Sequence, residues 1–340
     1  RNVIINGAMN VAQRGTSQTG ISNSGYYVCD RWRIASSATD GRATMTQDSS
    51  APEGFANSTK LACTTADTSI ASGELFNLSQ LIEGQNLQTF KKGTSSAVPV
   101  TASFYVKGNA SATYTVELED RDNTRYNSQE FPVTTDWVRV SRTFVADTTG
   151  TLDDDNAQSF RLNFWLHGGS TYTGGTHTDN VWHTTANQRI GDSQTSFFDS
   201  TDRTFFITGV QLEVGQNATS FEHEPFEKTL LKCKRYFFAK NTSYEPLGAG
   251  VWYGAGNILA DYTFEVEMRA APTMSVKSAD FGVAYEGGAS NTTNTTSCFD
   301  NIATRGARLN IAGWATNGTS GHGAYVQLND SEYVYADAEL

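Results

Sequence analysis

Short segments in which apolar and polar residues alternate recur between residues 100 and 166. They run from Val100 to Lys107, from Tyr114 to Leu118, from Trp137 to Phe144 and from Ser159 to Leu166. Alternation with a period of two indicates half-buried strands, and turn residues rather than helical patterns separate these segments. Strands that follow one another at such short intervals predict an antiparallel sandwich of the jelly-roll type.

The stretch from Arg203 to Phe226 contains a further strand and the end of this domain. Its even positions are expected on the core side of the strand: Phe206, Thr208, Val210, Leu212 and Val214. Residues 215–217 then supply turn chemistry, and Pro225 opens a segment that has lost the period of two. Pro near the start of a segment and Glu227 in its first turn favour a short helix. We therefore place one domain at 1–223 and a second at 224–340.

The second domain shows strand patterns as well. Strands are expected at 236–240, on either side of Ala271-Pro272, and around 297–303, 308–313 and 325–336. Loops rich in Gly, Asn and Thr at 248–256, 286–296 and 315–323 are expected to display Trp252 and Trp314. The predicted fold is all-β: a jelly-roll sandwich followed by a smaller β-sandwich domain, with a short helix at the junction.

Two segments near the beginning are less regular. Residues 2–6 and 26–36 have strand character, whereas the spacing between Leu75 and Leu87 fits either a helix or a strand with a bulge. Periodicity leaves these two alternatives open.

Charge and composition exclude several classes of partner. The formal charge is −11, and no Lys/Arg cluster marks a phosphate-binding face, so nucleic acid is not an expected partner. No apolar run approaches the roughly 20 residues of a membrane span, so membrane insertion is not expected. The cysteines are widely spaced and lack the paired pattern of a zinc site, which favours buried free thiols at Cys29, Cys63, Cys233 and Cys298.

Several motifs resemble those of bacteriophage tail-fibre and related virion proteins. They are INGAMNVAQRGT near the start with Asp30-Arg31-Trp32, then TGVQLEVGQNAT, FEHEPF, LLKCKRYFF and VEMRAAPT. The resemblance implies a carbohydrate-binding-module-like jelly roll, a terminal β domain, virion localisation, assembly into a homotrimer and contact with other virion proteins. None of these motifs is catalytic, and modules of this kind occur in fibres with different targets.

The segment SFRLNFWLHGG offers a candidate ligand-binding face. Phe160, Leu162, Phe164 and Leu166 form its core side, and the other side carries Arg161, Asn163, Trp165 and His167. An indole between polar neighbours can stack on a sugar ring while the neighbours bond its hydroxyls. The alternative is that the following loop, or a neighbouring subunit, covers Trp165. That loop adds Tyr172 and Trp182 to the candidate residues, and Trp252 and Trp314 complete them.

Catalysis and cofactors have little support in the sequence. The chain contains no Gly-X-Ser-X-Gly elbow, no His-Glu-X-X-His pair and no phosphate-binding glycine loop. The acidic run at 153–155 could hold a structural calcium ion but lacks the interleaved spacing of a dedicated loop. We therefore expect a non-enzymatic virion protein, a tail fibre or spike subunit, that contacts host surface polysaccharide. The alternatives are a purely structural capsid decoration or baseplate protein, or a polysaccharide depolymerase.

Overall fold

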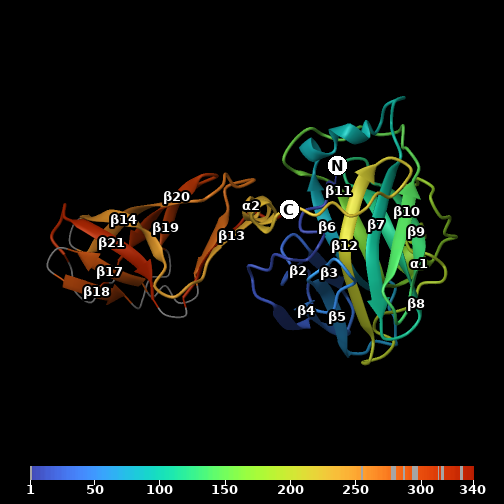
Figure 1. The fold of residues 1–340 in the computed structure, drawn as a ribbon, viewed down its shortest axis with the longest axis horizontal. Helices are drawn as coiled ribbons and strands as arrows, with labels where there is room; N and C mark the ends of the chain where they lie inside the picture. Colours follow the sequence, from blue (N-terminus) through green and yellow to red (C-terminus); the bar gives the residue numbers. More distant parts are fainter. Residues whose placement is uncertain are drawn as a thin grey trace. The chain divides into compact units, whose positions relative to one another are not determined.

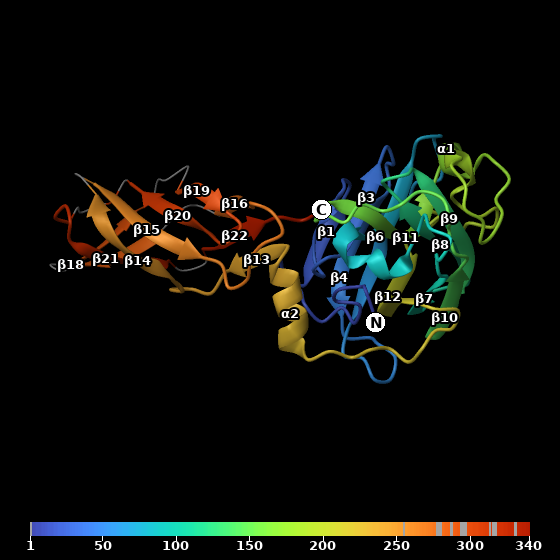
Figure 2. The ribbon, with the colours of Figure 1, turned by 90° about the horizontal axis from the view of Figure 1, so that it is seen from above.

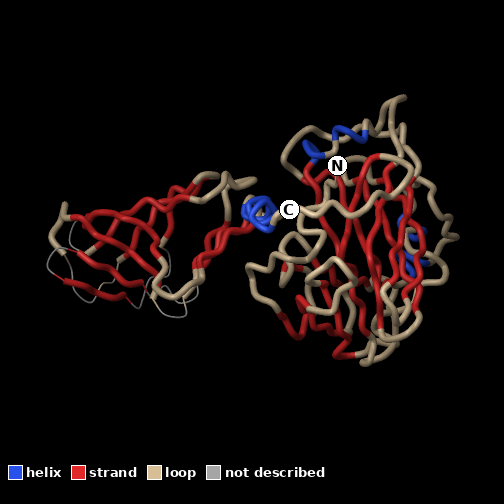
Figure 3. Tube along the Cα trace, in the orientation of Figure 1, coloured by secondary structure: helices blue, strands red, loops and turns tan. Residues whose placement is uncertain are grey.

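The chain folds into two compact units, Arg1–Thr229 and Leu230–Glu339. The structure is a computed structural model that describes residues 2–253, 256–276, 281–285, 288–292, 298–312, 314, 318–329 and 332–340. Both units are built from antiparallel strands (Figure 1, Figure 3). The helix α2 (Phe226–Lys234) spans the division between them. The predicted all-β fold with a short helix at the junction is confirmed.

The first unit contains two six-stranded sheets, which we call sheet A and sheet B. The strand order in sheet A is β1 (Ser17–Ile21), β4 (Arg42–Asp48), β5 (Ser58–Thr65), β12 (Thr204–Val214), β7 (Val100–Gly108) and β10 (Val138–Phe144). The order in sheet B is β2 (Gly25–Tyr26), β3 (Arg33–Ser37), β6 (Leu75–Glu83), β11 (Gln158–Gly168), β8 (Ala112–Asp120) and β9 (Arg125–Val133). From β9 to β12, successive strands alternate between the sheets, as a jelly roll requires.

The two sheets pack face to face around one core. Figure 2 shows them as two layers, with β6, β11 and β8 in one layer and β12, β7 and β10 in the other. Aromatic rings from both layers meet in the middle: Phe104 lies 4.9 Å from Phe164 and 5.1 Å from Phe131, measured between ring centroids. Trp32 packs against Phe164 at 6.2 Å. The core side predicted for 160–166 is confirmed, because all four apolar residues there are buried.

The second unit has a three-stranded and a seven-stranded antiparallel sheet in its described part. The first has the order β13 (Phe237–Lys240), β22 (Val334–Asp337) and β16 (Thr273–Val276). The second has the order β18 (Gly288–Thr292), β17 (Phe281–Tyr285), β21 (Gly323–Leu328), β14 (Pro246–Tyr253), β15 (Asn257–Thr263), β20 (Gly306–Ile311) and β19 (Phe299–Ala303). Its core includes Phe238, Leu309 and Val326.

Some predicted boundaries differ from the observed ones. Residues 2–6 do not form a strand; instead, the Val3 N–H donates to Leu212 O at 3.0 Å beside β12. The undecided region after Leu75 is the strand β6, followed by the 3-10 turns η1 (Gly84–Asn86) and η2 (Gln88–Phe90). The expected loop at 248–256 is largely strand β14. Of the other two expected loops, residues 286–287, 293–296 and 315–317 lie outside the described residues.

The sequence predicts that the even-numbered residues of β12 face the core, and this holds for only part of the strand. Phe205 and Ile207 point into the core before Gly209, whereas Val210 and Leu212 do so after it. The pairing of β12 with β7 shifts register between residues 208 and 211, and Gly209 has φ +61°. A bulge of this kind inserts one residue and exchanges the two faces of the strand. The prediction that Phe206 and Thr208 face the core was therefore wrong, and so was the prediction for Val214, which is exposed.

The opening motif is part of the sandwich structure. The Asn6 side-chain amide donates to Val11 O at 2.9 Å and to Asp30 O at 3.1 Å, and the Trp32 indole N–H donates to Asn6 O at 3.1 Å. A Cβ atom at Gly7 would lie 2.1 Å from Val210 O, so this close approach requires glycine. Hydrogen bonds therefore join the INGAMNVAQRGT motif to the Asp30-Arg31-Trp32 motif, and Gly7 packs against β12.

The four cysteines are free and buried, as predicted. Burial raises the pKa of the Cys29 thiol to about 12 and that of Cys63 to about 11. Thiols with such pKa values remain protonated and poorly nucleophilic near neutral pH.

Candidate glycan-binding surfaces

The outer face of sheet B, where Trp165 lies, is covered by the loop that follows β11. Trp165 is only 1% exposed. The Tyr172 ring packs 5.1 Å from the Trp165 ring, and the Arg189 guanidinium carbon lies 5.1 Å from the same ring. The indole N–H donates to Glu117 Oε1 at 3.1 Å. The expectation of an open binding face at Trp165 is therefore corrected, and the covered alternative is the one observed.

An ion cluster holds this loop on the sheet. Arg189 donates to both carboxylate oxygens of Glu117 at 2.8 and 2.7 Å and lies 3.0 Å from Glu119 Oε2. The side-chain amide of Asn163, which is also buried, donates to the carboxylates of Glu117 and Glu119. Burial alone would raise the pKa of Glu119, but Arg189, Arg161 and two hydrogen bonds lower it to about 2. Because these charges are buried and paired, the cluster orders the loop rather than offering groups to a ligand.

The remaining candidates on this side of the unit do not converge on one open site. Arg161 is partly exposed and lies 3.5 Å from Glu119. Trp182 is half-buried; its ring lies 6.1 Å from that of Phe160, and its indole N–H donates to Val145 O at 2.8 Å. Tyr172 is half-buried against Trp165, as described above.

His167 belongs to a buried relay. Its Nε2 lies 2.9 Å from Glu74 Oε2, and its Nδ1 lies 2.8 Å from Ser196 Oγ. A serine bonded to a histidine that is bonded to a carboxylate resembles the activated serine nucleophile of acyl-transfer enzymes. Acyl transfer also needs N–H groups directed at a developing oxyanion.

The N–H groups beside this serine are already bonded. The Thr195 N–H donates to Thr113 O, and the Phe197 N–H donates to Leu166 O, both at 2.8 Å. The Phe198 N–H donates to Ser196 Oγ itself at 3.1 Å. These bonds give the relay a structural role in anchoring the loop to β11.

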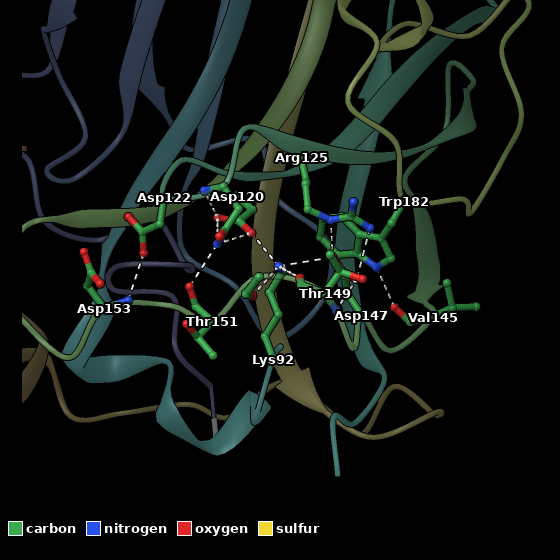
Figure 4. Close-up of polar contacts among 12 residues, drawn as sticks. Lys92, Asp120, Asp122, Arg125, Val145, Asp147, Thr149, Thr151, Asp153 and Trp182 are labelled. Carbon is green, nitrogen blue, oxygen red and sulfur yellow. Dashed lines mark hydrogen bonds and ion pairs between the residues drawn. The ribbon is translucent and has the colours of Figure 1, made fainter. Parts of the chain in front are cut away.

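A second buried ion cluster closes one end of the sandwich (Figure 4). The Lys92 ammonium donates to Thr149 O at 2.8 Å and to Gly150 O at 3.0 Å. It also pairs with Asp120 and lies 3.1 Å from Asp147. Arg125 binds both oxygens of Asp147 at 2.7 and 3.1 Å. Two cations thus neutralise two buried carboxylates at this corner.

The acidic run considered for calcium lies beside this corner. Asp153, Asp154 and Asp155 are exposed, and the Asp153 N–H donates to Asp122 Oδ2 at 3.0 Å. Within the ranges that the structure describes, no three or more His, Cys, Asp or Glu side chains are grouped to hold a metal ion. The run therefore carries no further argument for calcium.

The two candidate tryptophans of the second unit are buried rather than displayed. Trp252 is 1% exposed and Trp314 is 7% exposed, and their rings pack edge-to-face 6.0 Å apart. The Trp314 indole N–H donates to Ile311 O at 3.0 Å. The prediction that these residues are presented in loops is wrong, because residue 252 lies within β14 and faces the core.

The outer face of sheet A presents a row of alternating cations and aromatic rings, from three neighbouring strands and from the residue that precedes a fourth. Its members are Lys60, Phe206, Lys107 and Trp137, and we call them the sheet A row. Phe206 pairs with Lys60 on one side and with Lys107 on the other. Trp137 precedes Val138, whose partner is Val106, so the indole lies beside Lys107. The strands that carry the row lie side by side in Figure 1.

Contacts within the row are close. The Lys107 ammonium lies 5.0 Å from the Phe206 ring centroid and 5.5 Å from that of Trp137. The Lys60 ammonium lies 5.3 Å from the Phe206 ring. The two rings meet edge-to-face at 6.2 Å. Trp137 and Lys107 are half-buried, and the Lys60 side chain is 33% exposed, so solvent reaches the row.

A covering segment, residues 215–223, lies over the rest of this face. The Thr219 N–H donates to Glu213 Oε1 at 2.8 Å, and the Glu222 N–H donates to Gln211 Oε1 at 2.9 Å. Thr101 Oγ1 donates to Gly215 O at 2.8 Å. The polar residues of TGVQLEVGQNAT therefore form hydrogen bonds with the segment that follows them, which gives this motif a structural role. The sheet A row lies outside the part of the face that this segment covers.

A second cation lies next to the row. Arg139 pairs with Tyr105 across β10 and β7, and its guanidinium carbon lies 6.0 Å from the tyrosine ring. It donates to Ser103 Oγ at 3.3 Å and to Thr219 O. Lys107 donates to Ser50 Oγ at 2.9 Å. Neither Lys107 nor Arg139 forms an ion pair with a carboxylate of the described residues.

Comparisons with known proteins return distant structural likenesses. No protein family matches the sequence, and no curated protein does. The enzymatically active domain of bacteriophage CBA120 tailspike protein 4 is 12% identical with a TM-score of 0.33, over 63% of this chain and 21% of that one. TmCBM61, solved with β-1,4-galactotriose, is 11% identical with a TM-score of 0.32, over 63% and 99% of the two chains. The N-terminal cellulose-binding domain of Cellulomonas fimi β-1,4-glucanase C is 13% identical with a TM-score of 0.31, over 61% and 100%.

This chain spans about a fifth of the length of the tailspike domain. The strand order described above establishes the sandwich independently of these likenesses. Among the described residues, no helix is long and apolar enough to cross a membrane.

The sheet A row was not predicted from the sequence. Its members lie at positions 60, 107, 137 and 206, and only the strand pairing brings them together. One local feature of the sequence pointed to this face. Lys107 lies near the end of a strand with clear alternation, on the side opposite the core residues Phe104 and Val106.

Proposed function

We propose that this chain is a non-enzymatic, glycan-binding subunit of a bacteriophage virion, a tail fibre or spike that contacts host surface polysaccharide. The observation that carries the proposal is the sheet A row, which places a half-buried indole and two ammonium groups on an accessible sheet face. An indole face stacks on sugar rings, and ammonium groups donate to sugar oxygens.

The virion assignment is supported by the resemblance of several motifs in this chain to those of tail-fibre proteins. In the proposed particle, the chain is a homotrimer and contacts other virion proteins. Three copies would raise a weak single-site affinity through effective concentration, by about 10² to 10⁴ where the geometry allows simultaneous binding.

The absence of catalysis is also part of the proposal. The Ser196 relay has flanking N–H groups that are committed to other acceptors, as described above. We expect the chain to bind polysaccharide without releasing new reducing ends, which a reducing-sugar assay measures. New reducing ends from a homogeneous preparation would support the depolymerase alternative instead.

The test is binding of the whole chain to an array of bacterial surface polysaccharides. Trp137→Ala removes the stacking surface, and we expect it to weaken binding about tenfold. Tyr253→Ala is the matched control, because Tyr253 is an aromatic residue that is 66% exposed in the second unit. If the parent binds nothing, or if Trp137→Ala binds as the parent does, the adhesin proposal fails and a purely structural virion protein becomes the better reading.

A further inference from the structure

We propose that the sheet A row and Arg139 select acidic polysaccharides, binding sugar residues that carry a carboxylate. This inference rests on the proposed function, since it names the class of glycan that the same surface takes. Three features support it: the positive charge at this face, the placement of that charge beside aromatic rings, and the position of the row outside the covering segment.

The positive charge of Lys107 and Arg139 is local and has no carboxylate partner among the described residues. The whole chain carries a formal charge of −11, so a surplus of cations is not a general property of its surface. Lys60 has a carboxylate partner at 3.8 Å in Asp48. Lys107 and Arg139 make only neutral hydrogen bonds, to hydroxyl or carbonyl oxygens of the protein. A ligand carboxylate could therefore form an ion pair with Lys107 or Arg139 without displacing a protein carboxylate.

The cations are placed where a stacked sugar would present its substituents. Lys107 lies on the strand next to Trp137, and neighbouring strands are about 4.8 Å apart. A sugar ring on the indole would thus carry its substituents to within reach of the Lys107 ammonium. Lys60 lies two strands away from Lys107, a separation of about 10 Å. Its ammonium could therefore bind the next sugar residue of the polymer.

The covering segment limits where such a polymer can lie. Arg139 donates to Thr219 O, so this arginine is held at the boundary between the covered and open parts of the face. The part of the face beyond this boundary contains the ammonium groups and rings of the sheet A row. A neutral polymer could use the rings alone, whereas an acidic polymer could use both the rings and the cations of this surface.

The experiment uses the whole chain and an array of bacterial capsular polysaccharides. Each acidic polysaccharide is printed in its native form and after chemical reduction of its carboxylates to alcohols. We expect binding to native acidic polysaccharides, and binding to their reduced forms that is weaker by about tenfold, or 1.4 kcal/mol. Lys107→Gln should remove most of this difference, because it lowers affinity only for the native forms. Raising the salt concentration should weaken the same interactions.

Lys91→Gln is the matched control. It removes the same charge from an exposed turn next to Phe90, whose carbonyl accepts from the Val98 N–H near the start of β7. Lys107 lies at the other end of β7. If Lys107→Gln proves unstable by its melting curve, Arg139→Gln, at an exposed position, provides a second variant with the same expectation.

The outcomes separate the two proposals. Equal binding to native and reduced forms, or equal losses in Lys107→Gln and Lys91→Gln, overturns the selection for acidic glycans and leaves glycan binding standing. Binding to neither form overturns both proposals. Loss of the native-form preference in Lys107→Gln alone supports the inference.

Discussion

Replacing Lys92 by Met should strongly destabilise the first unit. The Lys92 side chain is 4% exposed and its ammonium is surrounded by two carboxylates and two backbone carbonyls. Methionine fills a similar volume but removes the charge. Asp120, which is fully buried, then keeps its hydrogen bonds from Asn123 but has no ion-pair partner among the described residues, because Arg125 on the neighbouring strand is paired with Asp147.

The magnitude follows from the charge balance of this corner. With Lys92, two cations face two carboxylates; without it, Arg125 still pairs with Asp147, and one buried negative charge is uncompensated. Breaking a buried pair in this way costs about 3–5 kcal/mol. For a unit of this size, each kcal/mol lowers the melting temperature by about 2–4 °C, so the expected decrease is about 6–20 °C.

Scanning calorimetry of the whole chain measures this decrease. Lys91→Met is the matched control, because Lys91 is exposed and its replacement should change stability by no more than about 0.5 kcal/mol. Adding Asp120→Asn to Lys92→Met should recover part of the loss, since it removes the uncompensated charge. A decrease below about 2 °C, or strictly additive losses in the double variant, would refute the reasoning.

Three further predictions concern the loop over sheet B, its acid sensitivity and assembly. Trp165→Ala should cost about 3–5 kcal/mol in the free energy of unfolding, because the indole is buried; chemical denaturation measures this, and an unchanged midpoint would contradict it. The folded pKa of Glu119, about 2, lies below its ordinary value of 4.5, so its contribution is complete above pH 4.5 and is lost as the pH falls towards 2. Glu119→Gln should therefore flatten the decline of stability over this range, and a parallel decline would be evidence against the cluster. Light scattering should give about three times the chain mass of 37.0 kDa, and a monomer would count against the proposed trimer.

The sequence predicts elements of this fold better than it predicts their faces. Alternation located β7, β8, β10 and β11, because each of these strands has one side in a single core. The same rule failed in β12, where the bulge at Gly209 exchanges the two sides within one strand. A glycine in an alternating segment is a signal for such a bulge, but its backbone angle depends on the strands that pair on either side.

The candidate site was less predictable for a related reason. Alternation placed Trp165 on the outer side of β11, but whether that side meets water depends on a loop held by Arg189, 24 residues later in the chain. The sheet A row depends on the register of four strands that are far apart in sequence. Local patterns carry no information about such registers, and only the assembled sheets show which aromatic rings remain accessible.

The first and last segments of the sandwich unit are neighbours. The Val3 N–H donates to Leu212 O at 3.0 Å, and the Asn2 N–H donates to Glu222 Oε2 at 3.1 Å. A pulling force applied between these two segments would therefore act first on the few hydrogen bonds that join them, one of which ends on strand β12.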